Sequence, residues 1–455
     1  MKIKHIEITN YRGFEKQSFS FDEHLTVIAG NNASGKTAAL NAVQVALGAY
    51  LRCLRALPAE KAYRRDFSKE EQFVRYVEKV KDYVPNKERT RVEVDVDFYE
   101  TQVTSTGKYV TKPSPIHWWR ELRGNYTTHT KECAGKLIQK VETMEDLRNE
   151  DRLPGSKDTQ VSNAIYPLVL SFGAKSINYQ YRSSLKRKNR EKKVQKAYKS
   201  ALRETVDFQG AFDWLYNYQD NLERNVEFEW TYEAFMRALM RAVPTLKQVR
   251  INIKNAQFEG TIEDAVTKRQ DTRVFEEMSD GYKSLISMAA EIAHRCIELN
   301  GFLGIDAITE TPGIVLIDEM ELYLHPLWQK HVLNDLQSAF PNIQFIVTTH
   351  SPFIIQSVKS KNIISLDGNV NTTDDPLYRS IEDVVMNEMN VDTVRSIKYN
   401  EMLSKAEKYY QLVMSDKGDS PEAEQVKKEL DEIEVNYSDN PAYVALLRAE
   451  RQTKR

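Results

Sequence analysis

LTVIAGNNASGKTAALNAVQVAL, residues 25–47, is the stretch that decides the fold of this chain. Its apolar start predicts a buried strand, its middle fits G-x-x-x-x-G-K-[ST], and Ala38 to Leu47 has the apolar spacing of a helix. This setting suits a phosphate-binding loop, because successive backbone N–H groups and the positive end of the helix dipole point at one anion. We therefore predict a nucleotide-binding loop between a strand and a helix.

The residues of this loop predict ATP and Mg²⁺ as cofactors. Gly30 and Gly35 allow the backbone angles, Lys36 would reach the β- and γ-phosphates, and the Thr37 hydroxyl would bind Mg²⁺. Arg12, in an earlier turn, could contact the nucleotide, but it could equally be a surface arginine with no role in binding. The predicted ATP-binding residues are Gly30, Asn31, Asn32, Ala33, Ser34, Gly35, Lys36, Thr37, Ala38 and this arginine, Arg12.

Composition narrows the class of protein. The 455 residues suffice for two or three domains, and 64 Lys and Arg against 66 Asp and Glu give a formal net charge of −2. A nucleic-acid contact would therefore need a local basic patch. Cys53, Cys133 and Cys296 are widely spaced, which argues for a reducing compartment and against a thiolate zinc site. The start has no signal-peptide core, and no run reaches about 18 apolar residues, so we expect a cytoplasmic protein without a membrane segment.

Two further apolar runs end in polar side chains. GIVLIDE, residues 313–319, predicts a buried parallel strand that ends at a carboxylate pair, the position at which open α/β sheets bind ligands. Asp318 suits a role as metal ligand, and Glu319 could polarise the attacking water. IQFIVTTH, residues 343–350, predicts another strand at the same edge, so we expect His350 to contact the γ-phosphate. Glu319 and His350 are the predicted catalytic residues.

Other segments indicate the wider organisation. Residues 91–98 alternate as a strand, with which 116–119 could pair, and residues 51–84 have a helical and charged pattern. The run 165–173 could be another parallel strand that brings a polar loop to the nucleotide. Gln180, shortly after it, could sense the metal and the water, but an ordinary exposed loop residue also explains it. Residues 279–294 predict an amphipathic helix that Ser279 caps. Helix capping alone would explain the polar, glycine-containing turn at the start of this helix.

One basic segment is the best local candidate for contacts with DNA. Lys186–Arg203, KRKNREKKVQKAYKSALR, carries many cations and a single glutamate. Such a segment on a helix can bind the phosphate backbone. Basic helices also serve solubility or contacts between subunits, and this more ordinary explanation is favoured over DNA contact.

The ordered motifs resemble those of ABC-type ATPases of the RecF, SMC and overcoming-lysogenization-defect branch. This resemblance implies an α/β ATPase head in which a parallel or mixed sheet with the P-loop stands beside an antiparallel sheet. It also implies that Ser279 and Gly281 act in trans on a nucleotide held by a second subunit, hence a homodimer or higher oligomer. The motifs are GNNASGKT at 30–37, SDGYKSL at 279–285, IVLIDE at 314–319, ELYLHP at 321–326 and TTHSP at 348–352.

The expected domains follow from that resemblance. ATPase lobe I with the P-loop would span 1–180, and a helical insertion would span 181–245. ATPase lobe II, with the SDGYKSL segment at 279–285 and the two strands that end in polar side chains, would span 246–370. The remainder, 371–455, would be a helical C-terminal interaction region. No sustained heptad repeat joins the lobes, which excludes the long rod of SMC proteins.

Within this branch the chain is similar to the PtuA family of the Septu anti-phage system. The similarity lies in ITNYRGFE at 8–15, IYPLVLSFGAK at 165–175, AFMRALMRAVPTLKQVR at 234–250 and a helical tail from about 381. It implies that a separate HNH nuclease of the PtuB type is the partner. The chain departs from its relatives at Lys175-Ser176, where an arginine is common, and from transporters at Asp280, where glycine is common.

The chain itself has neither a Toprim acidic set nor an HNH-type cluster of His and Asn, so we expect an ATPase that is not itself a nuclease. The alternative is a RecF-like DNA-repair ATPase clamp that binds DNA without a nuclease partner. A transporter motor is disfavoured, because no signal for coupling to a membrane partner is present.

Overall fold

The computed structural model describes residues 1–77, 81–85, 88–103, 109–150, 164–173, 192–203, 210–216, 229–252, 257–264, 267–367, 375–389, 391, 396–415 and 417–434. The chain divides into two compact units, Met1–Asn390 and Val391–Arg455. The finer domain boundaries at 180, 245 and 370 stay predictions.

A parallel sheet carries the three polar strand ends that the sequence predicts. Four of its five strands are buried on both faces, which explains why they are continuous apolar runs in the sequence, and the fifth, residues 363–365, is half-buried. The register pairs Gly313 with Leu168 and Ile343, so the strands predicted near 168, 313 and 343 are confirmed. In spatial order the strands are β15 (Ile363–Ser365), β3 (Leu25–Ala29), β14 (Ile343–Thr349), β13 (Gly313–Ile317) and β9 (Leu168–Phe172).

An antiparallel sheet forms the second layer of the first unit. The predicted pairing of 91–98 with 116–119 is confirmed, with Trp118 opposite Val94 and both buried. In spatial order its strands are β2 (Phe14–Ser20), β1 (Lys2–Tyr11), β6 (Arg91–Val103), β7 (Tyr109–Arg123) and β8 (Tyr126–Thr127). Two smaller antiparallel sheets consist of β4 (Val74–Val77) with β5 (Asp82–Pro85), and of β10 (Leu246–Asn252), β11 (Gln257–Glu263) and β12 (Gln270–Val274).

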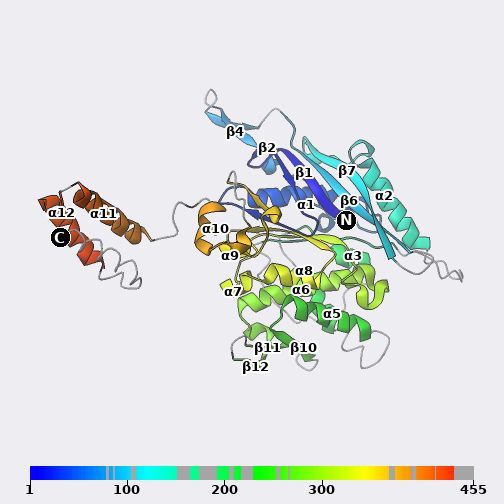
Figure 1. Cartoon of the computed structure of the whole chain (residues 1–455). Helices are drawn as coiled ribbons and strands as arrows, with labels where there is room; N and C mark the ends of the chain where they lie inside the picture. The colour runs from blue at the N-terminus through cyan, green and yellow to red at the C-terminus, as the bar shows by residue number, and fades with distance from the viewer. Residues whose placement is uncertain are drawn as a thin grey trace. The chain divides into compact units, whose positions relative to one another are not determined.

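Helices cover both faces of the parallel sheet (Figure 1). Helix α1 contacts β14 on one side and β1, β6 and β7 on the other, so it lies between the two large sheets. Helices α6 and α8 lie across the opposite face of the parallel sheet, and α5 packs on both of them. The described helices of this unit are α1 (Lys36–Cys53), α2 (Lys131–Glu150), α3 (Lys193–Tyr198), α5 (Glu229–Ala242), α6 (Asp280–Asn300), α7 (Pro326–Gln329), α8 (Val332–Ala339), α9 (Pro352–Gln356) and α10 (Ile381–Asn387).

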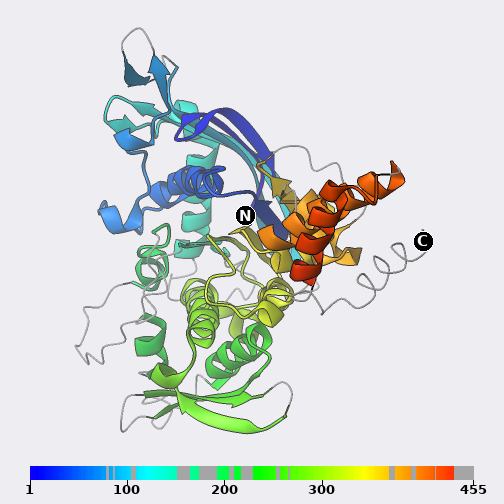
Figure 2. The same ribbon diagram turned by 90° about the vertical axis from the view of Figure 1, so that its left-hand side faces the viewer.

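The antiparallel sheet and the small β10–β12 sheet lie at opposite ends of the first unit, as Figure 2 shows. The parallel sheet and its helices lie between them, and most of the buried apolar side chains belong to one continuous core. Cys53, Cys133 and Cys296 are buried in this core as free thiols. The α/β fold with parallel and antiparallel sheets is thus confirmed.

The prediction that residues 51–84 are helical is wrong. Helix α1 ends at Cys53, and short 3₁₀ turns (Lys61–Tyr63 and Lys69–Glu71) and the β4–β5 hairpin follow. The charges of this segment have partners in the folded protein, since Arg65 pairs with Glu71 of the same segment at 2.6 Å and Asp66 accepts a hydrogen bond from the buried Arg120 of the antiparallel sheet. A charged pattern is therefore not evidence for a solvated helix here.

Helix α1 approaches the 65–66 segment closely at Gly48. A Cβ atom on Gly48 would lie 2.3 Å from the Arg65 carbonyl oxygen and 2.7 Å from Nη1 of Arg120. The same Nη1 donates to the carbonyls of Val45 at 2.8 Å and Arg65 at 2.5 Å, so it has little room to move. Gly48 is therefore required by this contact, even though glycine weakens a helix interior.

We expect Gly48→Ala to destabilise the protein by about 1–3 kcal/mol, the usual cost of overpacking a core. Urea unfolding measures the effect. Gly135→Ala in α2 is the matched control, because a Cβ atom there would meet only Cβ of Lys131 at 4.0 Å. An equal or higher stability of the Gly48 variant would contradict the close approach.

The second unit contains the helical pair α11 (Ile397–Met414) and α12 (Pro421–Glu434). Lys405 pairs with Glu429 and Lys408 with Glu422, each at 2.8 Å. This agrees with the helical, charged C-terminal region that the sequence predicts, as far as residue 434. Of the helices in the described ranges, none combines the length and the apolarity that crossing a membrane requires.

Candidate nucleotide site

The loop between β3 and α1 has the backbone of a phosphate cradle. Ala33 (φ 68°) and Gly35 (φ 102°) adopt left-handed conformations, and Asn31, Asn32 and Ala33 are exposed. A Cβ atom on Gly35 would lie 2.8 Å from the Phe14 ring, so glycine is required there for both φ and space. The hydroxyl of Ser34 is buried without a hydrogen-bond partner in the described part of the chain. Buried polar groups normally have a hydrogen-bond partner, and a bound anion could accept the hydrogen bond of the Ser34 hydroxyl.

Lys36 lies at the centre of the loop. Its side chain is buried, and Nζ donates to the carbonyls of Gly30 at 2.7 Å and Asn31 at 2.8 Å. Burial lowers the pKa of the Lys36 amine, and the nearby carboxylates of Asp367 and Glu321 oppose that shift. The ammonium group thus donates its hydrogen bonds to neutral carbonyls, which phosphate oxygens could replace.

Two oxygen-bearing side chains meet beside Lys36. Thr37 Oγ1 donates to Asp318, with 3.0 Å to Oδ2 and 3.2 Å to Oδ1. Two ligands at right angles and about 2.0–2.1 Å from Mg²⁺ lie about 2.9 Å apart, so this pair fits neighbouring positions of an octahedral site. Mg²⁺ prefers one or two carboxylates plus phosphate oxygens, which agrees with this small donor set.

Glu319 follows Asp318 with an unusual backbone. Its φ is 54°, a left-handed conformation that costs a residue other than glycine about 1–3 kcal/mol. The conformation is fixed by a hydrogen bond from the Glu319 backbone N–H to Thr348 Oγ1 at 2.8 Å, and the same hydroxyl donates to Asp318 Oδ1 at 2.6 Å. Such strain concentrates at functional sites, which supports a special role for Glu319.

His350 ends β14 and lies beside the loop lysine, with 3.4 Å between its Nδ1 and Lys36 Nζ. The Glu321 carboxylate positions it by accepting hydrogen bonds from the His350 backbone N–H and from Thr349 Oγ1, the latter at 2.7 Å. The structure therefore brings Lys36, Thr37, Asp318 and His350 to one place, at the carboxyl ends of β3, β13 and β14.

Two acidic residues of this site, Glu321 and Asp367, have no role predicted from the sequence. Glu321 accepts hydrogen bonds from the Thr349 hydroxyl and the His350 backbone N–H, and Asp367 Oδ2 accepts a hydrogen bond from the Asn31 backbone N–H at 2.5 Å. Asp367 follows the end of β15, the strand beside β3. The rule that ligand sites lie at the carboxyl ends of parallel strands could have indicated Asp367, but 363–365 is too short a strand to recognise in the sequence.

The SDGYKSL segment, residues 279–285, opens α6, as predicted. Ser279 is exposed at the N-cap position, but its side chain makes no capping hydrogen bond, so the predicted capping role is wrong. A Cβ atom on Gly281 would lie 2.8 Å from the Tyr323 carbonyl oxygen, so α6 begins directly against the segment after Glu319. Among the described residues, no hydrogen bond or ion pair joins Ser279 or Gly281 to loop 30–37.

Arg12 is held by a buried carboxylate in the turn between β1 and β2. Its Nη2 lies 2.8 Å from Glu71 Oε1, and Glu71 also accepts hydrogen bonds from Arg65 and Tyr11. Burial alone would raise the pKa of the Glu71 carboxyl, but the hydrogen bonds and charge of Arg65 outweigh it and give a pKa of about 2. Arg12 therefore has an ionised partner in this structure, and its contact with nucleotide stays a prediction.

Part of the predicted functional surface lies outside the described residues. This applies to Gln180, to Lys175-Ser176 and to the first residues, 186–191, of the basic segment. The rest of that segment includes α3, on which Ala197 and Tyr198 are buried while Lys193 and Lys196 are exposed. An exposed cationic face is thus present on the described portion, and its contact with DNA stays a prediction.

The strand, loop and helix, together with the acidic strand ends, define a P-loop ATPase. A family model described as an AAA domain matches residues 5–278. Because this is more than half of the chain, the protein belongs to that AAA domain family.

The chain is also similar to individual proteins. It is 35% identical over 161 residues to the retron Vc95 probable ATPase of Vibrio cholerae serotype O1 biovar El Tor, covering 33% of this chain and 30% of the relative. It is 30% identical over 148 residues to the Septu protein PtuA of Bacillus thuringiensis, covering 30% of this chain and 36% of the relative. The matched region thus spans about a third of the length of each relative.

A solved structure, the SMC head domain from Thermotoga maritima, aligns with 79% of this chain and 92% of its own, at a TM-score of 0.36 and 16% identity.

Proposed function

We propose that this protein binds ATP with Mg²⁺, hydrolyses it, and couples the nucleotide state to a partner HNH nuclease in anti-phage defence. The observation that carries the ATPase part is the meeting of Lys36, Thr37, Asp318 and His350 at one edge of the parallel sheet. Family membership and the name of the retron relative support the same activity.

Each side chain has a role that its surroundings support. Lys36 would exchange the carbonyls of Gly30 and Asn31 for β- and γ-phosphate oxygens, and Thr37 and Asp318 would hold the metal. Mg²⁺, when bound, neutralises the phosphate charge that develops during hydrolysis. Glu319 would accept a proton from the attacking water, and His350, positioned by Glu321, would donate to the γ-phosphate.

The second half of each site is proposed to come from another copy of the chain. Support comes from α6, which begins with an exposed Ser279 that makes no side-chain cap. The first N–H groups of a helix favour an anion, so this end of α6 could close over the γ-phosphate of a facing subunit. ATP would then stabilise a head-to-tail dimer, because the nucleotide has contacts with both subunits only in that state.

Mixing two inactive variants tests this shared site. Lys36→Ala and Ser279→Arg are each expected to be nearly inactive alone, and a 1:1 mixture should recover about a quarter of the wild-type ATPase rate. Random pairing makes half of the dimers mixed, and each mixed dimer has one intact site of two. Phosphate release measures the rate.

The variant Ser279→Arg should fold, because Ser279 is exposed. The control is a mixture of Lys36→Ala with Lys36→Ala,Ser279→Arg, in which no intact site can form. No recovery in the first mixture, with dimers present by light scattering, would contradict composite sites.

The nuclease partner is supported by similarity to a Septu PtuA over about a third of that relative's length. Co-purification with a PtuB-type HNH protein, and nuclease activity that differs between ATP-bound and ADP-bound protein, would support it. Tight binding of DNA by the isolated chain, with steep salt dependence, would favour the RecF-like alternative instead.

A further inference from the structure

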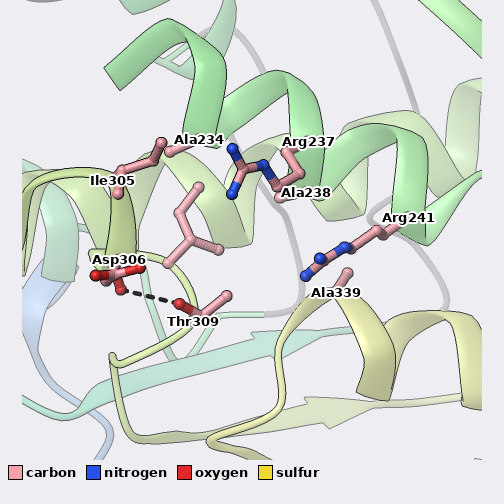
Figure 3. A pocket seen from close by; sticks show the side chains of 9 residues that line it. Ala234, Arg237, Ala238, Arg241, Ile305, Asp306, Thr309 and Ala339 are labelled. Atoms are coloured by element: carbon pink, nitrogen blue, oxygen red, sulfur yellow. Dashed lines mark hydrogen bonds between the residues drawn. The ribbon is translucent and has the colours of Figure 1, made fainter. Parts of the chain in front are cut away.

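We propose that a pocket between α5, the 3₁₀ turn Gly301–Asp306 and α8 binds a protein segment that carries an apolar side chain next to a carboxylate. The pocket holds about 200 Å³ and opens between the arginines of α5 and residues 305–309 (Figure 3). None of its lining residues belongs to the nucleotide site.

The volume and the floor of the pocket indicate what it can hold. Ala238, Ile308 and Ala339 are buried, so the floor is apolar. Pockets for drug-sized molecules hold about 300–1,000 Å³, which is more than this one offers. The space suits one apolar side chain of a partner, the kind of anchor that dominates protein–protein binding.

The mouth of the pocket is cationic on one side. Arg237 and Arg241 are one helical turn apart on α5, and in Figure 3 both side chains extend from the helix along the pocket. Glu233 holds Arg237, with 2.5 Å between Nη2 and Oε1, whereas Arg241 has no ion pair within the described ranges. Guanidinium groups bind carboxylates by paired hydrogen bonds, so Arg241 suits a carboxylate that follows the apolar anchor.

The surrounding charges favour a peptide over nucleic acid. Asp306 lines the side opposite the arginines and would repel a continuous row of phosphates. A nucleic-acid backbone also has no apolar group to fill the space above Ile308. In a short acidic segment, the apolar side chain can fill the pocket while its carboxylate faces the arginines, on the side away from Asp306.

The pocket lies at the edge of the parallel sheet opposite the nucleotide. Thr309 precedes β13 and Ala339 precedes β14, whereas Asp318 and His350 follow the ends of the same strands. Asn342 Nδ2 donates to the Thr309 carbonyl at 2.8 Å, which joins the starts of the two strands. A partner bound here would leave the phosphate loop accessible.

The test uses the full chain and fluorescein-labelled peptides Gly-Ser-Leu-Glu-Glu-Gly and Gly-Ser-Ala-Glu-Glu-Gly, with binding measured by fluorescence anisotropy. We expect the leucine peptide to bind and the alanine peptide to bind more weakly. Arg241→Glu should lower the affinity for the leucine peptide about tenfold or more. Arg269→Glu, a charge reversal at an exposed arginine of the β11–β12 turn, is the matched control and should bind like wild type.

Three results would overturn the proposal: no binding of the leucine peptide, equal binding by Arg241→Glu, or displacement of the peptide by a duplex DNA of about 20 base pairs. Arg241 is exposed, so its replacement should not unfold the chain, and urea unfolding checks this. Peptide binding is also expected to persist in Lys36→Ala, so this test does not depend on the ATPase assignment.

Discussion

Glu319→Gln is expected to bind ATP as wild type does and to hydrolyse it about 10²–10⁴-fold more slowly, the contribution typical of a positioned general base. The amide retains the size of the carboxylate but cannot accept a proton from water. Because φ at residue 319 is 54°, a substitution that also changed the backbone preference would mix two effects. Glutamine avoids this.

Two measurements separate the roles of Glu319. Binding of a fluorescent ATP analogue reports the ground state, and phosphate release reports turnover. Glu310→Gln is the matched control, because Glu310 is exposed and precedes β13 rather than following it. Unchanged turnover in Glu319→Gln would remove Glu319 from the chemistry, and lost binding would assign it a structural role.

The strand, loop and helix were predictable because their signals are local. A glycine motif between an apolar run and a helical pattern depends on neighbouring residues only, and the same holds for IVLIDE and FIVTTH. The sheet then aligned Asp318 and His350 beside Lys36, as parallel strands with a common carboxyl edge require.

The predictions that failed depend on contacts between distant residues. The charged segment after Cys53 was interpreted as a helix, but Arg55 pairs with the buried Glu145 of α2 and Asp66 accepts a hydrogen bond from the buried Arg120 of β7. The role of Glu321 as the support of His350 and the hydrogen bond from Asn31 to Asp367 exist only once the strands are aligned. The missing Ser279 cap likewise depends on a side-chain orientation that no spacing specifies.

Lys36→Ala is expected to weaken ATP binding by about 2–5 kcal/mol, the cost of truncating one partner of a buried charge pair, which is about 30-fold or more in affinity. Without nucleotide, Nζ is held by the carbonyls of Gly30 and Asn31, both of which are weaker partners than phosphate. The substitution therefore removes more stabilisation from the ATP complex than from the free protein.

Isothermal titration with ATP and Mg²⁺ measures this difference. Lys4→Ala is the control, since Lys4 pairs with Asp97 at 3.2 Å on the antiparallel sheet and should not affect nucleotide binding. Urea unfolding of both variants shows whether the fold is intact. If folded Lys36→Ala binds ATP with wild-type affinity, the loop cannot be the phosphate site. The roles of Thr37, Asp318, Glu319 and His350 would then fail together, because each is assigned by its position relative to phosphates that Lys36 holds.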